Sequence, residues 1–558
     1  MNKLNIQVGI SDFIKLRQDN CYYIDKSSLI VDLLQKSAAE VTLITRPRRF
    51  GKTLGMSMLA SFFDINKDNR KFFADLEISR HEALCQNWQN QWPVIFLSFR
   101  RVDGLDFAGA YAMLVAVIAE LYKQHLYLLE SKKISTFDKQ TMLAILEQRA
   151  TASTIKGSLL LLTHLLQAHY GKPVILLLDE YDVPLAKASS NGYYQQMLDV
   201  MKGIMQALKD NPSLQLAVIT GCLKIAKESI FTGTNNFISD TIADSRLNEY
   251  FGFVQADVDK LLEDAGYKDK GTLIKQWYDG YQFGSVDVYC PWDVMNYLRD
   301  LQYNPQAQPA GYWRNTSDNA IIRSFIDLVG DGITKKLEIL LAGGYISQHI
   351  DENITYDYLH ASEENFWSIL YLTGYLTRAR EDELSQRLSA GQTALKLPNQ
   401  EIKEIFKTTV AQWFSDSARQ WNRENLFNAV WSGDTEAATI ELNKLLRKTI
   451  SYHDYKEDFY HAFLAGVFAG AGYTVDSNKE HGEGRSDVIV YDQVNGRVAV
   501  FEAKYASALE QLEPACAKAL TQIDARAYAE EFKDDYDRVL CYGIAFFKKR
   551  CLLQSRQM

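Results

Sequence analysis

The chain has 558 residues, which is enough for about three domains that each bury a core of their own. Hydrophobic residues make up 47% of it and aromatic residues 12%, which excludes a disordered chain and is typical of globular proteins. The net charge of −9 at pH 7 excludes a global basic field for nucleic acid, although it leaves a local basic groove open.

The first informative stretch is a strand, a loop and a helix. The apolar, β-branched run 41–45 predicts a buried strand, Gly51-Lys52-Thr53 follows a short loop, and apolar residues of 54–62 fall on one helix face. This order predicts a phosphate-binding loop, because backbone N–H groups hold phosphates, the lysine reaches the outer ones and the hydroxyl binds Mg²⁺. The tripeptide alone also occurs in ordinary turns.

The usual first glycine of such a loop is replaced by Arg46. Arginine lacks the freedom of glycine at positive φ, a conformation that costs other residues about 1–2 kcal/mol. We therefore expect a loop path that differs from the standard one, with the charge of Arg46 compensating.

Two further strands carry polar ends. After a strand at 93–99 and helices at 107–122 and 159–169, the apolar run 174–178 is followed by Asp179 and Glu180. In P-loop NTPases such an aspartate belongs to the Mg²⁺ shell and the adjacent glutamate orients or deprotonates water. The alternative is a buried strand that ends in solvated acids.

The next predicted strand, 215–221, ends close to Lys224. A basic residue at this place senses the γ-phosphate or simply caps a surface helix, and the residues leave both interpretations open.

Several strings resemble the bacterial predicted AAA-ATPase-like family: RPRRFGKT at 46–53, LDEYDVPL at 178–185, AKESIF at 226–231, WYDGY at 277–281 and TGYL at 373–376. The resemblance covers nearly the whole chain and implies an additional-strand P-loop ATPase core. It implies that Thr53 and Asp179 bind metal and that Glu180 is catalytic. The nucleotide-binding residues it implies are Arg46, Arg48, Arg49, Phe50, Gly51, Lys52, Thr53, Asp179 and Lys224.

Two positions bear on the comparison with this family. Arginine in place of glycine at position 46 is the habit of the family. At position 224 the family tends to have arginine, and Lys224 keeps the charge but loses the bidentate fork.

The stretch 254–450 shows no catalytic motif and predicts a mostly helical lid or connector. It is rich in aromatic residues without interleaved basic ones, which favours a packed core over a base-stacking surface. These residues are Trp277, Tyr278, Tyr281, Tyr289, Trp292, Tyr312 and Trp313.

The third constellation lies after residue 450. Asp487 opens an apolar strand, Asn495-Gly496 predicts a hairpin turn, and the answering strand carries Glu502 and Lys504. Glu502 and Lys504 are two apart, so they share one face, and the hairpin brings Asp487 near them. Two carboxylates can hold a divalent cation, and the lysine can position a water or steady the developing charge.

This pattern resembles the PD-(D/E)XK nuclease superfamily. The resemblance makes Asp487, Glu502 and Lys504 the signature, with Asp487 and Glu502 as metal ligands, and Glu457 the acid from the preceding helix. No His-x-Glu or His/Cys spacing around His461 suggests a zinc site, so a structural or surface role is expected for this residue.

The remaining features bear on the cellular compartment of the protein. Seven scattered cysteines without a Cys-x-x-Cys pair predict reduced thiols in a cytoplasmic protein. The run 459–475 lacks Asp, Glu, Lys and Arg but is interrupted by glycines, so it predicts a buried helix and turn, not a membrane span.

We therefore predict a cytoplasmic, multidomain α/β protein of bacterial type. Its parts are an AAA-like P-loop ATPase domain (1–253), a helical connector (254–450) and a restriction-endonuclease-like domain (451–558). ATP and Mg²⁺ are the expected cofactors, and nucleotide state regulates a metal-dependent nuclease-like domain that prefers DNA to RNA. The alternative is a non-nucleolytic, nucleotide-dependent switch or binding protein with a degenerate nuclease fold. A protein partner or homo-oligomer stays open, and no membrane is expected.

Overall fold

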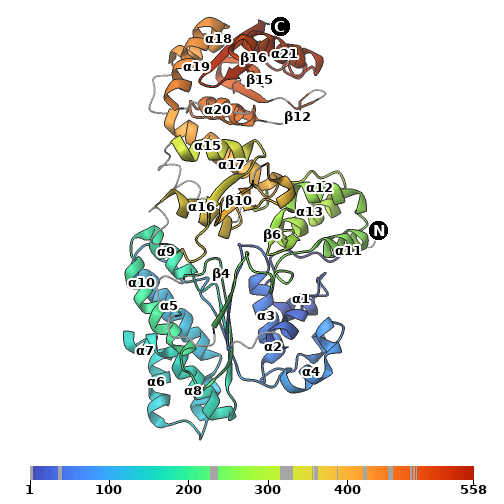
Figure 1. Cartoon of the computed structure of the whole chain (residues 1–558). Helices are drawn as coiled ribbons and strands as arrows, with labels where there is room; N and C mark the ends of the chain where they lie inside the picture. The colour runs from blue at the N-terminus through green and yellow to red at the C-terminus, as the bar shows by residue number, and fades with distance from the viewer. Residues whose placement is uncertain are drawn as a thin grey trace. The chain divides into compact units, whose positions relative to one another are not determined.

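The computed structural model describes residues 4–35, 40–225, 231, 237–313, 331–354, 356, 362–385, 387–418, 424–449, 457–477, 480–481, 484–485 and 487–557. The chain divides into two compact units (Figure 1). Unit 1 contains 1–317, 348–378 and 388–393, and unit 2 contains 318–347, 379–387 and 394–558. The predicted connector is thus divided between both units. Each unit is described by itself below.

Unit 1 is built on a parallel sheet of order β2-β3-β4-β1-β5. Its strands are β1 (Val41–Thr45), β2 (Val94–Ser98), β3 (Val174–Asp179), β4 (Leu214–Gly221) and β5 (Phe237–Asp240). All residues of β1 and β3 are buried, as their apolar, β-branched composition predicts for a parallel sheet. The strand β4 lies between β1 and β3, which confirms the additional-strand arrangement.

Helices cover both faces of this sheet (Figure 1). One group consists of α1 (Phe13–Gln18), α2 (Ser28–Gln35), α3 (Lys52–Phe63) and α4 (Glu82–Trp88). The other consists of α5 (Phe107–Lys123), α6 (Thr136–Leu146), α7 (Ala152–Lys156), α8 (Ser158–Tyr170), α9 (Val183–Asn191) and α10 (Tyr194–Ile204). The core on the α3 side is rich in rings, with Phe62 packed against Phe63 and Phe73.

A second apolar core in unit 1 follows the sheet. It is formed by α11 (Gln255–Ala265), α12 (Gly271–Tyr278) and α13 (Pro291–Tyr303), with the hairpin β6 (Tyr281–Phe283) and β7 (Val286–Val288) beside it. Tyr278 and Tyr289 are buried in this core, as predicted for the aromatic cluster. Unit 1 also holds α16 (Glu363–Leu372).

A separate sheet has the order β8-β10-β9, with strands β8 (Ile346–His349), β9 (Thr377–Arg378) and β10 (Gln392–Lys396).

Unit 2 contains a mixed sheet of order β11-β14-β15-β16-β17. The strands are β11 (Thr474–Ser477), β14 (Val488–Asp492), β15 (Arg497–Tyr505), β16 (Arg538–Phe547) and β17 (Arg550–Gln557). Only the pair β15–β16 is parallel. The two-residue strands β12 (Glu480–His481) and β13 (Gly484–Arg485) pair separately.

The helices of unit 2 are α15 (Asp331–Leu341), α17 (Gln400–Ala418), α18 (Glu424–Ser432), α19 (Thr435–Thr449), α20 (Glu457–Ala469) and α21 (Leu512–Ala525). Phe468 of α20 packs on Phe501 of β15, whereas Ile523 of α21 packs with Val498 and Val500. Because neighbouring residues of a strand point to opposite faces, α20 and α21 cover opposite faces of the sheet. Within the described residues, we find no helix with the length and apolarity needed to span a membrane.

Candidate functional sites

The loop after β1 ends at the start of α3, as the sequence predicts. Gly51 precedes the helix at φ 84°, a left-handed conformation that glycine adopts without strain, and Lys52 is the first helical residue. The Lys52 ammonium donates hydrogen bonds of 2.8 Å to the carbonyl oxygens of Arg46 and Pro47. Lys52 is therefore folded back onto the loop, where its charge compensates the carbonyl dipoles.

The carboxylate of Asp179 is held by hydroxyl groups from three elements. Thr53 of α3 donates to its Oδ2 at 2.9 Å, and Ser98 of β2 donates to the same oxygen at 3.2 Å. Thr220 of β4 donates to Oδ1 at 2.6 Å. Asp179 is completely buried at the end of β3, so these bonds fix the direction of both oxygens. Ser98 and Thr220 escaped the sequence analysis, although each is a polar residue at or near the end of a predicted strand.

Glu180 follows directly and has the positive φ of 52°, which is uncommon for a residue with a side chain. Its pKa is raised, first by burial and then by the charge of Asp179, while Lys52 and Arg100 act in the opposite direction. A carboxyl group with a raised pKa beside the predicted phosphate-binding loop suits general-base or water-orienting chemistry.

Arg46 points into the core, away from the candidate nucleotide site. Its guanidinium is 0% exposed and forms an ion pair of 2.6 Å with Asp240 of β5. A second nitrogen donates to the carbonyl oxygens of Thr45 and Asp240. The φ of Arg46 is not positive; within this loop Arg49 (73°) and Gly51 have that conformation. Glycine is therefore not needed at position 46.

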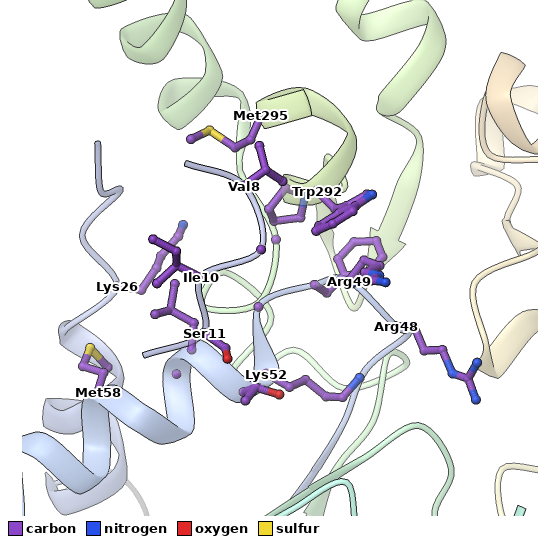
Figure 2. Close-up of a pocket in the computed structure, with 18 of the residues that line it drawn as sticks. Val8, Ile10, Ser11, Lys26, Arg48, Arg49, Lys52, Met58, Trp292 and Met295 are labelled. Atoms are coloured by element: carbon purple, nitrogen blue, oxygen red, sulfur yellow. The ribbon is translucent and has the colours of Figure 1, made fainter. Parts of the chain in front are cut away.

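A cavity of about 400 Å³ adjoins the loop (Figure 2). It is lined by the segment 7–11, by 48–55, by Glu180 and by the start of α13. Figure 2 shows Val8, Ile10 and Met295 together on one side of the loop, with Arg48 pointing the opposite way. Such a mainly apolar cavity beside charged groups has the size of a small-molecule site.

Some of the predicted nucleotide-binding residues line this cavity and others do not. Those that line it are Arg48, Arg49, Phe50, Gly51, Lys52 and Thr53, whereas Arg46, Asp179 and Lys224 do not. Trp292, predicted as core, also lines it and stacks on the Arg49 guanidinium at 4.1 Å. Lys224 is half-buried beyond the end of β4.

Asp182, which follows β3, holds the end of β4 in place. Asp182 Oδ2 accepts hydrogen bonds from the backbone N–H groups of Cys222 (2.9 Å) and Leu223 (3.1 Å) and from the hydroxyl of Tyr356 (2.9 Å). Gly221 permits this approach, since a Cβ there would lie 2.7 Å from the ring of Tyr181 and 2.8 Å from Asp182. The segment that follows β4, the strand next to β1 in the sheet, is thereby held in place.

In unit 2 the register of β14 and β15 brings the predicted acids together. Val488 pairs with Phe501, so Asp487 stands opposite Glu502 at the same end of the sheet. Asp487 Oδ2 accepts a hydrogen bond of 2.8 Å from the N–H of Ala503, and Lys504 Nζ donates to Glu502 Oε1 at 2.9 Å. Two carboxylates and one lysine therefore meet there.

The electrostatics of this group are unusual. Glu502 is 0% exposed, and its pKa is raised to about 7, first by burial and then by the charge of Asp487. Lys504 and His461 lower it in part. Within the described residues, Glu502 Oε2 has no hydrogen-bond partner. An orphaned buried oxygen next to a second acid fits an additional cation as ligand.

His461 of α20 also belongs to this group. Its Nε2 lies 3.1 Å from Asp487 Oδ2, and its side chain is largely buried. The sequence analysis expected a structural or surface role. A usable signal was its spacing of four from Glu457, because residues i and i+4 share a helix face.

The other predicted member is described only in part. Glu457 is the first residue of α20, and its side chain lies outside the described residues. In the part of the chain that is described, no three His, Cys, Asp or Glu side chains converge closely enough to form a ready metal site. Asp487 and Glu502 are thus the acids on which a metal proposal rests.

Comparison with known proteins supports both domain resemblances. Residues 7–231 match the family model "Predicted AAA-ATPase", and residues 455–556 match that of the "PD-(D/E)XK nuclease superfamily". The chain is also 24% identical over 564 residues to an "Uncharacterized protein in vnfD 5'region" of Azotobacter chroococcum mcd 1, covering 98% of this chain and 97% of that protein. The two matches confirm the resemblances and give the chain an ATPase-like and a nuclease-like part.

Proposed function

We propose that this chain, which joins an AAA-ATPase-like domain to a PD-(D/E)XK nuclease-like domain, binds and hydrolyses ATP. We further propose that nucleotide state regulates metal-dependent cleavage of nucleic acid, with DNA preferred. The observation that carries the ATP part is the hydrogen bond from Thr53 to Asp179, which joins the helix after the phosphate loop to the acid of β3. That pair is what coordination of a nucleotide-bound Mg²⁺ requires.

The residues divide the work at the ATP site. The backbone N–H groups around Gly51 and the ammonium of Lys52 would bind phosphate oxygens, with Lys52 leaving its two carbonyl partners. Thr53 and Asp179 would hold Mg²⁺, which offsets phosphate charge when bound. Glu180 would orient or deprotonate the attacking water. Arg46 takes a structural role in this proposal, because its guanidinium is buried against Asp240.

The test of the ATP site is a pair of variants. Lys52→Ala is expected to lose nucleotide binding, since it removes the cation that this proposal assigns to the phosphates. Glu180→Gln is expected to bind ATP within about threefold of the parent while hydrolysis falls by about 10²-fold or more. Calorimetry and phosphate release on folded full-length protein measure both. Unchanged ATP affinity in the Lys52 variant would sink the assignment.

At the nuclease-like site, Asp487 and Glu502 would hold Mg²⁺ or Mn²⁺, and the cation would offset the repulsion between these acids and a phosphodiester. Lys504 lies on the face of Glu502 and would position the attacking water. His461 holds Asp487 from the side of α20 in this proposal, and Glu457 stays the predicted helical acid.

The nuclease test uses single- and double-stranded DNA and RNA, each metal, and reactions with and without ATP. The wild-type protein is compared with Asp487→Ala/Lys504→Ala, which removes one ligand and the lysine. Cleavage that disappears in the variant supports the proposal, whereas equal cleavage in both proteins points to a contaminant. No cleavage under any condition favours the non-nucleolytic switch.

A further inference from the structure

The last strand pair of unit 2 carries an uneven distribution of charge. Residues 538–558 contain five lysines and arginines and no aspartate or glutamate, in a chain whose net charge is −9. Three of these cations are consecutive: Lys548, Lys549 and Arg550 form the turn between β16 and the start of β17. Of the other two, Arg538 donates to the carbonyl oxygens of Trp431 and Ser432, and Arg556 pairs with Asp524.

Strand register places this turn beside the candidate nuclease site. Lys504 pairs with Ala545 in the parallel ladder, and Phe547 pairs with Arg550 across the turn. At about 3.3 Å per residue, the turn begins about 10 Å beyond Ala545 along β16. It therefore projects from the same end of the sheet as Lys504.

Helix α20 ties the turn and the site together through consecutive residues. The hydroxyl of Tyr460 donates a 3.0 Å hydrogen bond to the carbonyl oxygen of Lys548, and the Tyr460 ring stacks on Phe546 at 4.1 Å. The next residue, His461, lies 3.1 Å from Asp487. The turn is thus anchored to the helix that also contacts Asp487.

The side chains of the turn are accessible. Arg550 is exposed, and Lys548 and Lys549 are partly exposed. Lys548 adopts φ 52°, a conformation at which glycine or asparagine carries no such strain. A lysine at a strained position, next to two further cations, favours a role for the charge itself.

We propose that Lys548, Lys549 and Arg550 bind the phosphate backbone of the nucleic-acid strand that enters the Asp487–Glu502–Lys504 site. The proposal rests on the nuclease function proposed above and names the surface that captures its substrate. Such a contact answers the difficulty that an acidic chain poses, because three cations next to the acids give a local attraction for phosphates. Backbone binding of this kind is independent of sequence.

The experiment compares two sets of neutralising substitutions in full-length protein that also carries Asp487→Ala, so that no substrate is cut. The test variant is Lys548→Gln/Lys549→Gln/Arg550→Gln. The matched control is Lys444→Gln/Lys518→Gln/Lys533→Gln, which removes the same charge from exposed positions of the same unit. In that control Lys444 and Lys533 already face Glu441 and Glu530. Thermal unfolding verifies that both variants are folded.

Binding of labelled single-stranded DNA, duplex DNA and RNA of equal length is titrated over a range of salt concentrations. For duplex DNA each lost phosphate contact makes the negative slope of log K against log salt less steep by about 0.9, so the slope of the test variant should be less steep by about 3. Its affinity at 0.1 M salt should fall at least about tenfold, while the control stays within about threefold. The substrate whose affinity falls most identifies the bound class.

The results that would overturn this inference can be told apart from those that would overturn the proposed function. A test variant that binds like its parent, or that weakens no more than the control, overturns the inference. If the wild-type protein nevertheless cleaves nucleic acid, the proposed function stands without this surface. Absence of binding by the parent to all three substrates overturns the inference and contradicts the proposed function as well.

Discussion

At the scale of single residues, Arg46 illustrates how burial decides the role of a charge. Taking a guanidinium out of water is costly, and burial indeed lowers the pKa of Arg46, which the charge of Asp240 opposes. The cost is offset by the ion pair with Asp240, by two carbonyl acceptors and by the rings of Phe251 and Phe283 at 5.7 and 5.4 Å. Arg46 thus fastens the phosphate-loop strand to β5.

This role predicts a stability effect without a binding effect. Arg46→Met should destabilise unit 1 by about 3 kcal/mol, because among the described residues it leaves the buried Asp240 with Arg246, at 3.4 Å, as its ion-pair partner. The affinity of the folded variant for ATP should stay within about threefold, since Arg46 does not line the cavity. Urea unfolding and calorimetry measure the two quantities.

The double variant Arg46→Met/Asp240→Leu is the control, and it should recover a large part of the lost stability because the unpaired acid is gone. If Arg46→Met is as stable as the parent but cannot bind ATP, the arginine contacts phosphate, as the sequence analysis expected, and the structural role is refuted.

At the scale of elements, the sequence was most informative where a buried strand ends in a charged motif. The strands β1, β3 and β4 and the helix α3 were predicted within a residue or two, because continuous apolar runs and the Gly-Lys-Thr motif are local signals. The hydroxyl groups around Asp179 were not predictable in this way. Ser98 and Thr220 reach it only because β3 lies between β2 and β4, and that order is a property of the sheet.

In unit 2, too, features with a local sequence signal were predicted, whereas contacts that depend on packing were not. Alternation along β15 predicted that Glu502 and Lys504 share a face, and the antiparallel pairing with β14 delivered Asp487. The turn is longer than the predicted two residues: Gln493–Asn495 form a short 3₁₀ helix before Gly496. His461 was missed because its contact with Asp487 joins a helix to the sheet. Its spacing of four from Glu457 places both residues on one helix face but does not show which part of the sheet that face packs against.

The sheet order leads to a prediction about Thr220. Thr220→Val keeps the shape of the side chain but removes the 2.6 Å hydrogen bond to Asp179, leaving that buried carboxylate oxygen without this donor. ATP hydrolysis should slow about tenfold, because a hydrogen bond to a charged group contributes about 1.5–3 kcal/mol and here orients the acid. Nucleotide affinity should change less than threefold.

Ser98→Ala is the matched comparison, since its bond to the same carboxylate is longer, at 3.2 Å. It should slow hydrolysis less than Thr220→Val. Steady-state phosphate release and nucleotide titration separate rate from binding. A Thr220 variant with normal turnover would mean that Asp179 is held adequately by Thr53 and Ser98.

At the scale of the whole molecule, the two candidate sites lie in different units. The proposed regulation must therefore appear as a coupling free energy between two binding events. Such coupling is reciprocal: if ATP changes the affinity for nucleic acid by some factor, nucleic acid must change the affinity for ATP by the same factor. This requirement holds whatever path connects the units.

The prediction uses full-length protein with Glu180→Gln and Asp487→Ala, so that neither ligand is consumed. We expect ATP to strengthen or weaken nucleic-acid binding by about tenfold, within the usual range of 1–3 kcal/mol, and saturating nucleic acid to shift ATP affinity equally. Adding Lys52→Ala should abolish the shift, because ATP no longer binds. A factor of one in both directions would contradict regulation while leaving two independent activities. Unequal factors would show that one titration reports a process other than binding, such as assembly of several chains.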